Sequence, residues 1–299
     1  MTDLPHAPPV QVEPLLVRTR DERALTAWAF QPATPGAASV VLLGALAAPQ
    51  RYLRHTARAL AAAGYPTLTF DYRGVGESQP AGAPTSNLDD WAEDARAAVE
   101  ACRARFAPSR ILAVGHSIGG MLIGHGGLGE QVDAALLIGA THGRPPYYQG
   151  WPRARLEAAY RVLPGVARVL GELPPWGWLL GASLPRDVVR HWVRWGREGF
   201  VRWDGSPSAP AFLRLRAPLL AAAIADDDYA PLPAVDALLD QFRGAGRRRV
   251  LLDPRQHDRR QRLGHFGLFR ADAPAWAQEA LLGWLAELER SCARYEASG

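Results

Sequence analysis

Residues 115–120 read Gly-His-Ser-Ile-Gly-Gly, and this stretch sets the expectation for the whole chain. The apolar run before it, residues 110–115, is typical of a buried strand, and the residues from Gly119 onward follow a helical pattern. Glycines on both sides of the serine permit the tight turn that must join such a strand to such a helix. The sequence therefore predicts a sharp strand–turn–helix unit with Ser117 at its apex.

Strands and helices alternate through most of the rest of the chain. Near the start, two alternating polar and apolar stretches around a charged turn predict an antiparallel hairpin. After it, short β-branched runs alternate with amphipathic segments, a pattern typical of an α/β fold with a mostly parallel sheet of about eight strands and helices on both faces. The expected strands are residues 10–18, 25–30, 39–44, 67–71, 110–115, 134–139, 218–224 and 249–253, and the expected helices besides the one after Ser117 are residues 52–63, 88–106, 233–242 and 274–288.

One long stretch, residues 142–217, interrupts this alternation. A structureless loop of that length is improbable inside a compact domain. Its best helical pattern, residues 186–199, has an apolar stripe opposite a row of arginines. We therefore expect a helical lid over residues 142–217, inserted into a core made of residues 1–141 and 218–299. The stretch carries six of the ten tryptophans, Trp151, Trp176, Trp178, Trp192, Trp195 and Trp203.

Ser117 is a candidate nucleophile, because a tight turn between strand and helix projects the serine oxygen above the sheet. The N-terminus of the following helix would aim its free amides at the same point, so the Ile118 amide can help to bind an oxyanion. A second amide is expected in the loop after the strand 39–44, where we prefer Ala45 to Leu46. The alternative, a plain glycine-rich turn, is weaker in this strand-to-helix context.

A serine nucleophile needs a general base, and the base needs a carboxylate that orients it. In sites of this kind the chain order is serine, acid, histidine. Three consecutive carboxylates, Asp226, Asp227 and Asp228, follow the apolar strand at 218–224. They could form only a solvated turn, but we favour a catalytic acid here and prefer Asp227, four residues before Pro231, to Asp226.

The base is expected late in the chain, on a loop after the last strand. Residues 263–267, Leu-Gly-His-Phe-Gly, supply His265, and Gly264 permits a sharp approach of the backbone. His257 is the competitor, but it lies among arginines, where a solvated histidine is the ordinary expectation. His142, at the start of the expected lid, either faces the substrate or lies on the surface.

Together these motifs resemble the α/β-hydrolase superfamily. They are the run at residues 64–78, Gly-Tyr-Pro-Thr-Leu-Thr-Phe-Asp-Tyr-Arg-Gly-Val-Gly-Glu-Ser, with Gly-His-Ser-Ile-Gly-Gly and Gly-His-Phe-Gly. Within the superfamily the chain is most similar to a poorly characterised bacterial branch of predicted serine hydrolases, related to the serine aminopeptidases and the monoacylglycerol-lipase-like enzymes. The phrase at residues 184–188 with Trp192 and Trp195 also resembles that branch.

The resemblance covers about residues 15–288 and implies an α/β-hydrolase fold with the catalytic triad Ser117, Asp227 and His265. Many relatives have His-Gly after the third strand where this chain has Leu43-Gly44, and the glycine that the turn needs is kept. The elbow and the run at 64–78 are specific to the superfamily and not to a substrate.

The leading hypothesis is hydrolysis of a carboxylic ester or related acyl bond of a small molecule through an acyl-enzyme. The tryptophan-rich lid favours an apolar or aromatic substrate, with Trp192, Trp195 and His142 as candidate contacts. An acyltransferase, a carbon–carbon bond hydrolase or an aminopeptidase would use the same triad, and a non-catalytic binding protein on this fold is a further alternative. No metal and no organic cofactor is implied.

Composition limits the partners. The net charge is +4, and every basic residue is an arginine spread along the chain, which favours a solvated surface over a nucleic-acid site. No apolar run approaches the roughly 18 residues of a membrane helix, and the N-terminus has no signal-peptide pattern. The two cysteines, Cys102 and Cys292, fit no metal or redox spacing. We therefore expect a cytoplasmic protein with neither a nucleic-acid nor a membrane partner; the sequence sets no oligomeric state.

Overall fold

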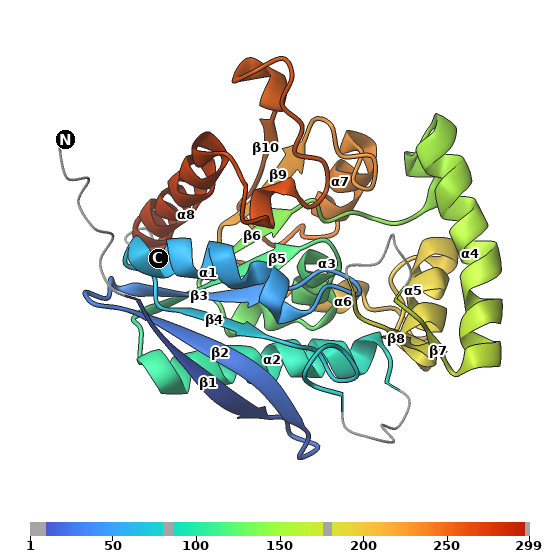
Figure 1. Cartoon of the computed structure of the whole chain (residues 1–299), viewed down its shortest axis with the longest axis horizontal. Coiled ribbons are helices and arrows are strands. Elements are labelled where there is room, and N and C mark those ends of the chain that lie inside the picture. The colour runs from blue at the N-terminus through green and yellow to red at the C-terminus, as the bar shows by residue number, and fades with distance from the viewer. Residues whose placement is uncertain (1–9, 80–85, 176–180, 297–299) are drawn as a thin grey trace.

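An eight-stranded sheet runs through the computed structural model, which describes residues 10–79, 86–175 and 181–296 (Figure 1). The strands lie in the order β1-β2-β4-β3-β5-β6-β9-β10. The two pairings β1–β2 and β2–β4 are antiparallel, and all later pairings are parallel. The predicted, mostly parallel sheet is therefore confirmed. Its strands are β1 (Val10–Arg18), β2 (Ala24–Pro32), β3 (Ala38–Leu43), β4 (Thr67–Phe70), β5 (Arg110–His116), β6 (Ala134–Ile138), β9 (Leu219–Ile224) and β10 (Arg247–Leu252).

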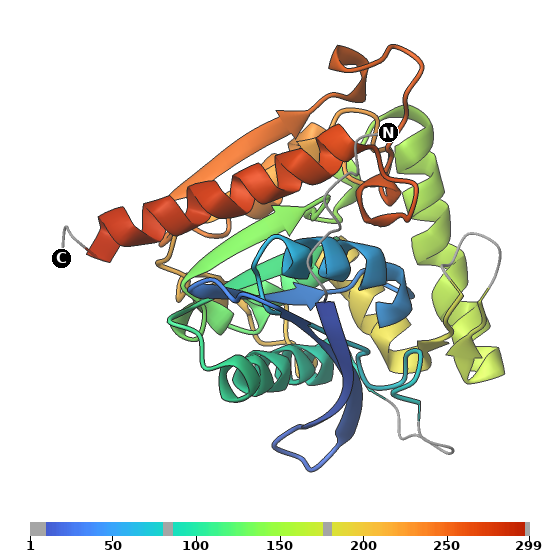
Figure 2. The same ribbon diagram turned by 60° about the vertical axis from the view of Figure 1, so that its left-hand side comes forward.

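Helices cover both faces of this sheet (Figure 2). One face carries α1 (Arg54–Ala62) and α8 (Ala275–Glu296), which pack in one apolar core. The other face carries α2 (Leu88–Phe106), α3 (Ile118–His125) and α7 (Leu232–Leu239), which pack in a second core. Short 3₁₀ turns complete this part of the fold: η1 (Gln50–Leu53), η2 (Leu128–Glu130), η3 (Pro145–Tyr147), η4 (Pro254–Gln256) and η5 (Gly267–Phe269).

The strand β3 shows how the sequence produces this layered arrangement. All six of its residues are buried, because both of its faces are covered. Val41 and Leu43 point into the core under α2 and α3, whereas Val40 and Leu42 point into the core under α1 and α8. Successive side chains of a strand alternate between the faces, so a continuous apolar run is what a strand buried on both sides requires.

The segment between β6 and β9 forms helices of its own. Both views place α4 and α5 beside the sheet edge at which the parallel strands end (Figures 1 and 2). The helix at residues 186–199 was expected; α4 was not, because Pro164 and Gly165 interrupt its pattern. Pro164 lies inside α4, where it removes one backbone hydrogen bond without ending the helix. The elements are α4 (Gly150–Leu170), β7 (Glu172–Leu173), β8 (Leu184–Pro185), α5 (Arg186–Glu198) and α6 (Ala209–Phe212).

Candidate active site

Ser117 occupies a strained turn between β5 and α3. It is the single residue between these elements, and its backbone has φ 54° and ψ −117°. Residues other than glycine rarely adopt this conformation. A β-carbon at Gly115 would lie 2.4 Å from the Gly120 nitrogen, and one at Gly119 would lie 2.3 Å from the Leu43 oxygen. Both glycines of the motif are therefore required by close backbone packing, and the predicted strand–turn–helix unit is present.

Asp227 and His265 meet in a buried ion-pair geometry. Oδ2 of Asp227 lies 2.7 Å from Nδ1 of His265, and the two residues are only 5% and 7% exposed. The other carboxylate oxygen, Oδ1, accepts the backbone N–H groups of Tyr229 at 2.8 Å and Ala230 at 3.0 Å. With its Nδ1–H donated to Asp227, the neutral imidazole keeps Nε2 as an acceptor. The structure thus brings His265 to Asp227 and not to Asp226.

The elbow and this Asp–His pair meet at the end of β6. The Ser117 amide donates to the Ile138 carbonyl oxygen at 3.0 Å. The next residue, Gly139, has φ +56°, and a β-carbon there would lie 3.1 Å from Asp227 Oδ2 and 3.2 Å from His265 Nδ1. Within the described part of the chain the Ser117 hydroxyl makes no hydrogen bond. In unliganded sites the bond between nucleophile and base is often long and tightens only with substrate.

The two amides expected to bind an oxyanion lie at the same end of the sheet. Ile118 is the first residue of α3, so its N–H has no acceptor within the helix. Ala45 lies in the loop after β3 and is almost completely buried. The close approach of Gly119 to Leu43 brings this loop beside the start of α3.

His116, which precedes the serine, was not singled out from the sequence. Its ring is fully buried, and its Nε2–H donates to the backbone oxygen of His265 at 2.9 Å. Burial lowers the pKa of His116 well below its usual value, so the ring is neutral. The competing histidine, His257, is exposed, and its ring stacks on Trp276. The position of His116 inside the glycine–serine motif was the signal that could have found it.

The candidate substrate contacts on α5 lie in different surroundings. Trp195 is 3% exposed, and its indole N–H donates to the Val201 oxygen at 2.8 Å. Its ring also packs against His125 of α3. Trp192 is only half-buried and meets the Tyr160 ring edge-on, with 4.9 Å between ring centroids. The structure therefore places Trp195 in the packing between α5 and α3 and leaves part of Trp192 accessible.

The other candidates from the insertion are also spread apart. His142 is 6% exposed and packs against Phe200 and Tyr147. Burial, reinforced by nearby Arg144, lowers the pKa of His142 to about 4. Trp151 is 72% exposed on the outer side of α4. Trp176 and Trp178, two further tryptophans of the expected lid, lie outside the described residues.

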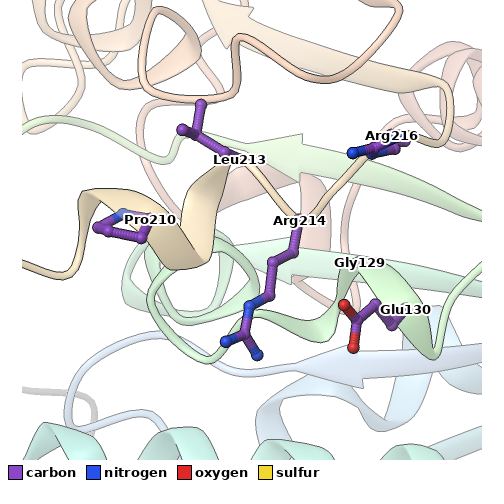
Figure 3. A pocket seen from close by; sticks show the side chains of 6 residues that line it. All are labelled: Gly129, Glu130, Pro210, Leu213, Arg214 and Arg216. Carbon is purple, nitrogen blue, oxygen red and sulfur yellow. The ribbon is translucent and has the colours of Figure 1, made fainter.

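A pocket of about 430 Å³ lies away from this site (Figure 3). Glu130 and Arg216, in its lining, come just before β6 and β9 respectively, at the end of the sheet where the parallel strands begin. Ser117 and Asp227 follow the opposite, carboxyl ends of their strands, where ligands bind in open α/β sheets. The pocket is therefore separate from the candidate active site. It is lined by Gly129, Glu130, Pro210, Leu213, Arg214 and Arg216.

The described residues contain neither a candidate metal site nor a candidate membrane span. Across residues 10–79, 86–175 and 181–296, no three His, Cys, Asp or Glu side chains are grouped so that they could hold a metal ion. In the same ranges no helix combines the length and the apolar character needed to cross a membrane. Cys102 and Cys292 are both buried, and no disulfide joins them.

Known proteins resemble this chain in sequence and in fold. The family model described as serine aminopeptidase, S33, matches residues 34–192. The solved structure of DcsB in complex with its substrate analogue has a TM-score of 0.67 at 13% identity, over 93% of this chain and 99% of that chain. An esterase domain from Rhodothermus marinus has a TM-score of 0.55 at 21% identity, over 92% of this chain and 97% of that chain.

A third structure, the Pyrococcus furiosus esterase Pf2001, has a TM-score of 0.63 at 15% identity, covering 94% of this chain and 91% of that chain. At such low identities these likenesses show a shared fold. No curated protein matches the sequence. The α/β-hydrolase fold predicted from the sequence is confirmed by the sheet and by these comparisons.

Proposed function

The chain belongs to the serine aminopeptidase S33 family of α/β-hydrolase enzymes, and we propose that it cleaves a carboxylic ester or related acyl bond with Ser117 as nucleophile. The observation that carries this proposal is the buried Asp227–His265 pair, which lies against Gly139 beside the strained Ser117 turn. An imidazole that is oriented by a carboxylate and lies close to a partly exposed serine elbow is the arrangement that activates a hydroxyl.

The proposed mechanism uses each group in turn. His265 Nε2 takes the hydroxyl proton as Ser117 attacks the substrate carbonyl, while Asp227 fixes the imidazole tautomer and stabilises its positive charge. The amides of Ile118 and Ala45 donate to the oxyanion of the tetrahedral intermediate. His265 then protonates the leaving alcohol, and a water molecule releases the acyl group by the same steps. The mechanism requires neither a metal nor an organic cofactor.

The substrate we propose is a small molecule with an apolar or aromatic acyl group, and the insertion at residues 142–217 acts as the lid over it. Trp192 is the proposed contact because its ring is only partly covered, against the edge of Tyr160. Trp195 has a packing role instead: its indole N–H is hydrogen-bonded to the Val201 oxygen, and its ring packs against His125 of α3. His142, buried and neutral, is the first residue of the proposed lid.

An aminopeptidase of the same family would need a free carboxylate in the lid to bind the substrate ammonium group. Between His142 and Asp204 the chain has ten arginines and five acidic residues. Three of those five, Glu157, Asp187 and Glu198, are already paired with neighbouring arginines. This charge distribution counts against a substrate with a free ammonium group.

A substrate panel tests the proposal. Nitrophenyl esters from acetate to dodecanoate and phenylacetate are compared with aminoacyl nitroanilides, and products are identified with and without an added alcohol. We expect ester hydrolysis with a preference for apolar acyl groups and negligible anilide cleavage. Cleavage of aminoacyl anilides without ester hydrolysis would overturn the ester assignment, and predominant ester exchange with the alcohol would identify an acyltransferase.

A further inference from the structure

Asp226, the carboxylate next to Asp227, binds the loop that carries His265, and we propose that it is a positioning residue for the catalytic base. Its Oδ2 accepts the backbone N–H of Leu263 at 3.1 Å, and its Oδ1 accepts the N–H of Gly264 at 3.1 Å. Both carboxylate oxygens thus bind the two amides that directly precede His265. The inference rests on the proposed function, because it assigns Asp226 a task in that same site.

Of the two residues that Asp226 binds, Leu263 is buried and its carbonyl oxygen accepts the Gly267 N–H at 2.9 Å, whereas Gly264 has no side chain to fix it. Gly264 has φ +55°, and the space where its β-carbon would lie contains no heavy atom within 4 Å. Side-chain packing therefore does not fix the backbone there, and a glycine has more conformational freedom than any other residue. Hydrogen bonds to a charged acceptor are stronger than those to a neutral one. The carboxylate of Asp226 is consequently the side-chain group that binds the backbone at Gly264.

Two further side chains hold the residues that follow. The His265 oxygen accepts from His116 Nε2 at 2.9 Å, and the Phe266 oxygen accepts from the hydroxyl of Tyr52. Four consecutive residues are thus each bound through their backbone by a side chain from another element. Asp226 binds the two residues before His265, whereas His116 and Tyr52 bind the carbonyl oxygens of His265 and of the residue after it.

The turn that contains both aspartates is itself fixed to the sheet. The Ala225 amide donates to the Leu252 oxygen at 2.9 Å, and the Asp227 amide donates to the Ile224 oxygen at 3.1 Å. One anchored turn therefore positions the His265 ring through Asp227 and the His265 backbone through Asp226. In metal sites, groups that are hydrogen-bonded to the ligands commonly affect activity by about 10- to 100-fold, and we take this as the scale expected for Asp226.

Three variants separate positioning from charge. Asp226→Asn keeps the size but replaces one acceptor oxygen with an amide that faces a backbone N–H. Asp226→Glu keeps the charge but displaces the two oxygens, and Asp228→Asn removes the same charge from an exposed neighbour whose side chain has no described hydrogen bond. Turnover of a nitrophenyl ester is divided by the number of sites that a fluorophosphonate probe titrates, so misfolded protein does not contribute.

We expect kcat per titrated site to fall about 10- to 100-fold in both Asp226 variants, with KM changed less than about two-fold and Asp228→Asn like the wild type. Equal losses in Asp226→Asn and Asp228→Asn, with none in Asp226→Glu, would overturn the inference in favour of a charge effect. Wild-type kcat in both Asp226 variants would also overturn it and leave the proposed function intact. Absence of probe labelling in the wild type would refute the proposed function itself.

Discussion

Asp227 uses both carboxylate oxygens inside the site, one for His265 and one for two backbone amides. Asp227→Asn should lower kcat/KM by on the order of 10⁴-fold, because an amide neither stabilises the imidazolium nor enforces the required tautomer. Steady-state kinetics on a nitrophenyl ester measure this loss, with Asp228→Asn as the control. A loss smaller than ten-fold would show that His265 does not depend on Asp227.

At the scale of single residues, the sequence pointed to several of the side chains that the structure brings together. The spacing of glycines around Ser117 predicted the turn, and chain order predicted an acid in the run of three aspartates and a late histidine. The offset to Pro231 favoured Asp227 over Asp226 as the acid. The contact of Asp226 with the loop before His265 was not predictable, because it depends on where that loop folds back onto the turn after β9. The contact of His116 with His265 depends on the same long-range packing.

Two tryptophans on α5 allow the lid to be tested as an element. Trp192→Ala should lower kcat/KM at least ten-fold more for dodecanoate or phenylacetate esters than for acetate, since Trp192 is the proposed acyl contact. Trp195→Ala should instead destabilise the protein by about 3–5 kcal/mol, as expected for a buried tryptophan, without changing the acyl preference. Kinetics per titrated site and thermal melting measure the two effects.

An equal loss of activity for short and long esters in Trp192→Ala, together with a lower Tm, would show that Trp192 is packing. That result would contradict the role of α5 in substrate recognition. It would leave the assignment of Ser117 and His265 unaffected.

Helices and strands were predictable from the sequence where a local pattern of residues determines them. The strand β3 is buried on both faces and reads as a continuous apolar run, and α2 begins where Asn87 and Asp90 form a capping box. The helix α4 was missed because Pro164 and Gly165 oppose helix formation locally, whereas packing of its buried face maintains the helix. Tertiary contacts of that kind leave no local signal.

The whole molecule contains several buried, neutral histidines, and this makes its stability depend on pH. In each of them burial is the largest cause of a lowered pKa, which reaches about 4 in His125 and His142. For His125 the neighbouring Asp89 raises the pKa and partly opposes burial. The set consists of His116, His125, His142 and His191.

The sign of the pH effect follows from the depressed pKa values. Unfolded histidines take up protons below about pH 6.5, and the folded ones resist protonation, so stability is complete above pH 6.5 and falls as the pH falls toward 4. A histidine with a folded pKa near 4 should contribute a loss of about 2 kcal/mol between pH 7 and pH 5.

Urea unfolding at several pH values measures this dependence. In His142→Gln the free energy of unfolding should decline less between pH 7 and pH 5 than in the wild type. His257→Gln, at an exposed position, should show the same decline as the wild type. Identical slopes in all three proteins would contradict the burial of a neutral His142.

The overall arrangement was predictable because parallel strands bring their carboxyl ends to one edge of the sheet. Ser117 follows β5, Gly139 follows β6 and the aspartates follow β9, so the three segments meet although they are distant in sequence. The position of α4 and α5 at that edge follows from their insertion after β6 (Figure 1). Which lid side chains turn inward depends on packing between helices.

The central claim, that Ser117 is the nucleophile, is tested most directly by labelling with a fluorophosphonate probe followed by intact-mass and peptide analysis. The wild type should gain one probe per chain, on the peptide that contains Ser117. Ser117→Ala, which removes one oxygen at the elbow, should keep the wild-type Tm, remain unlabelled and lose roughly 10³- to 10⁶-fold in turnover. Labelling of Ser117→Ala at the wild-type rate, or of a different residue in the wild type, would contradict the account.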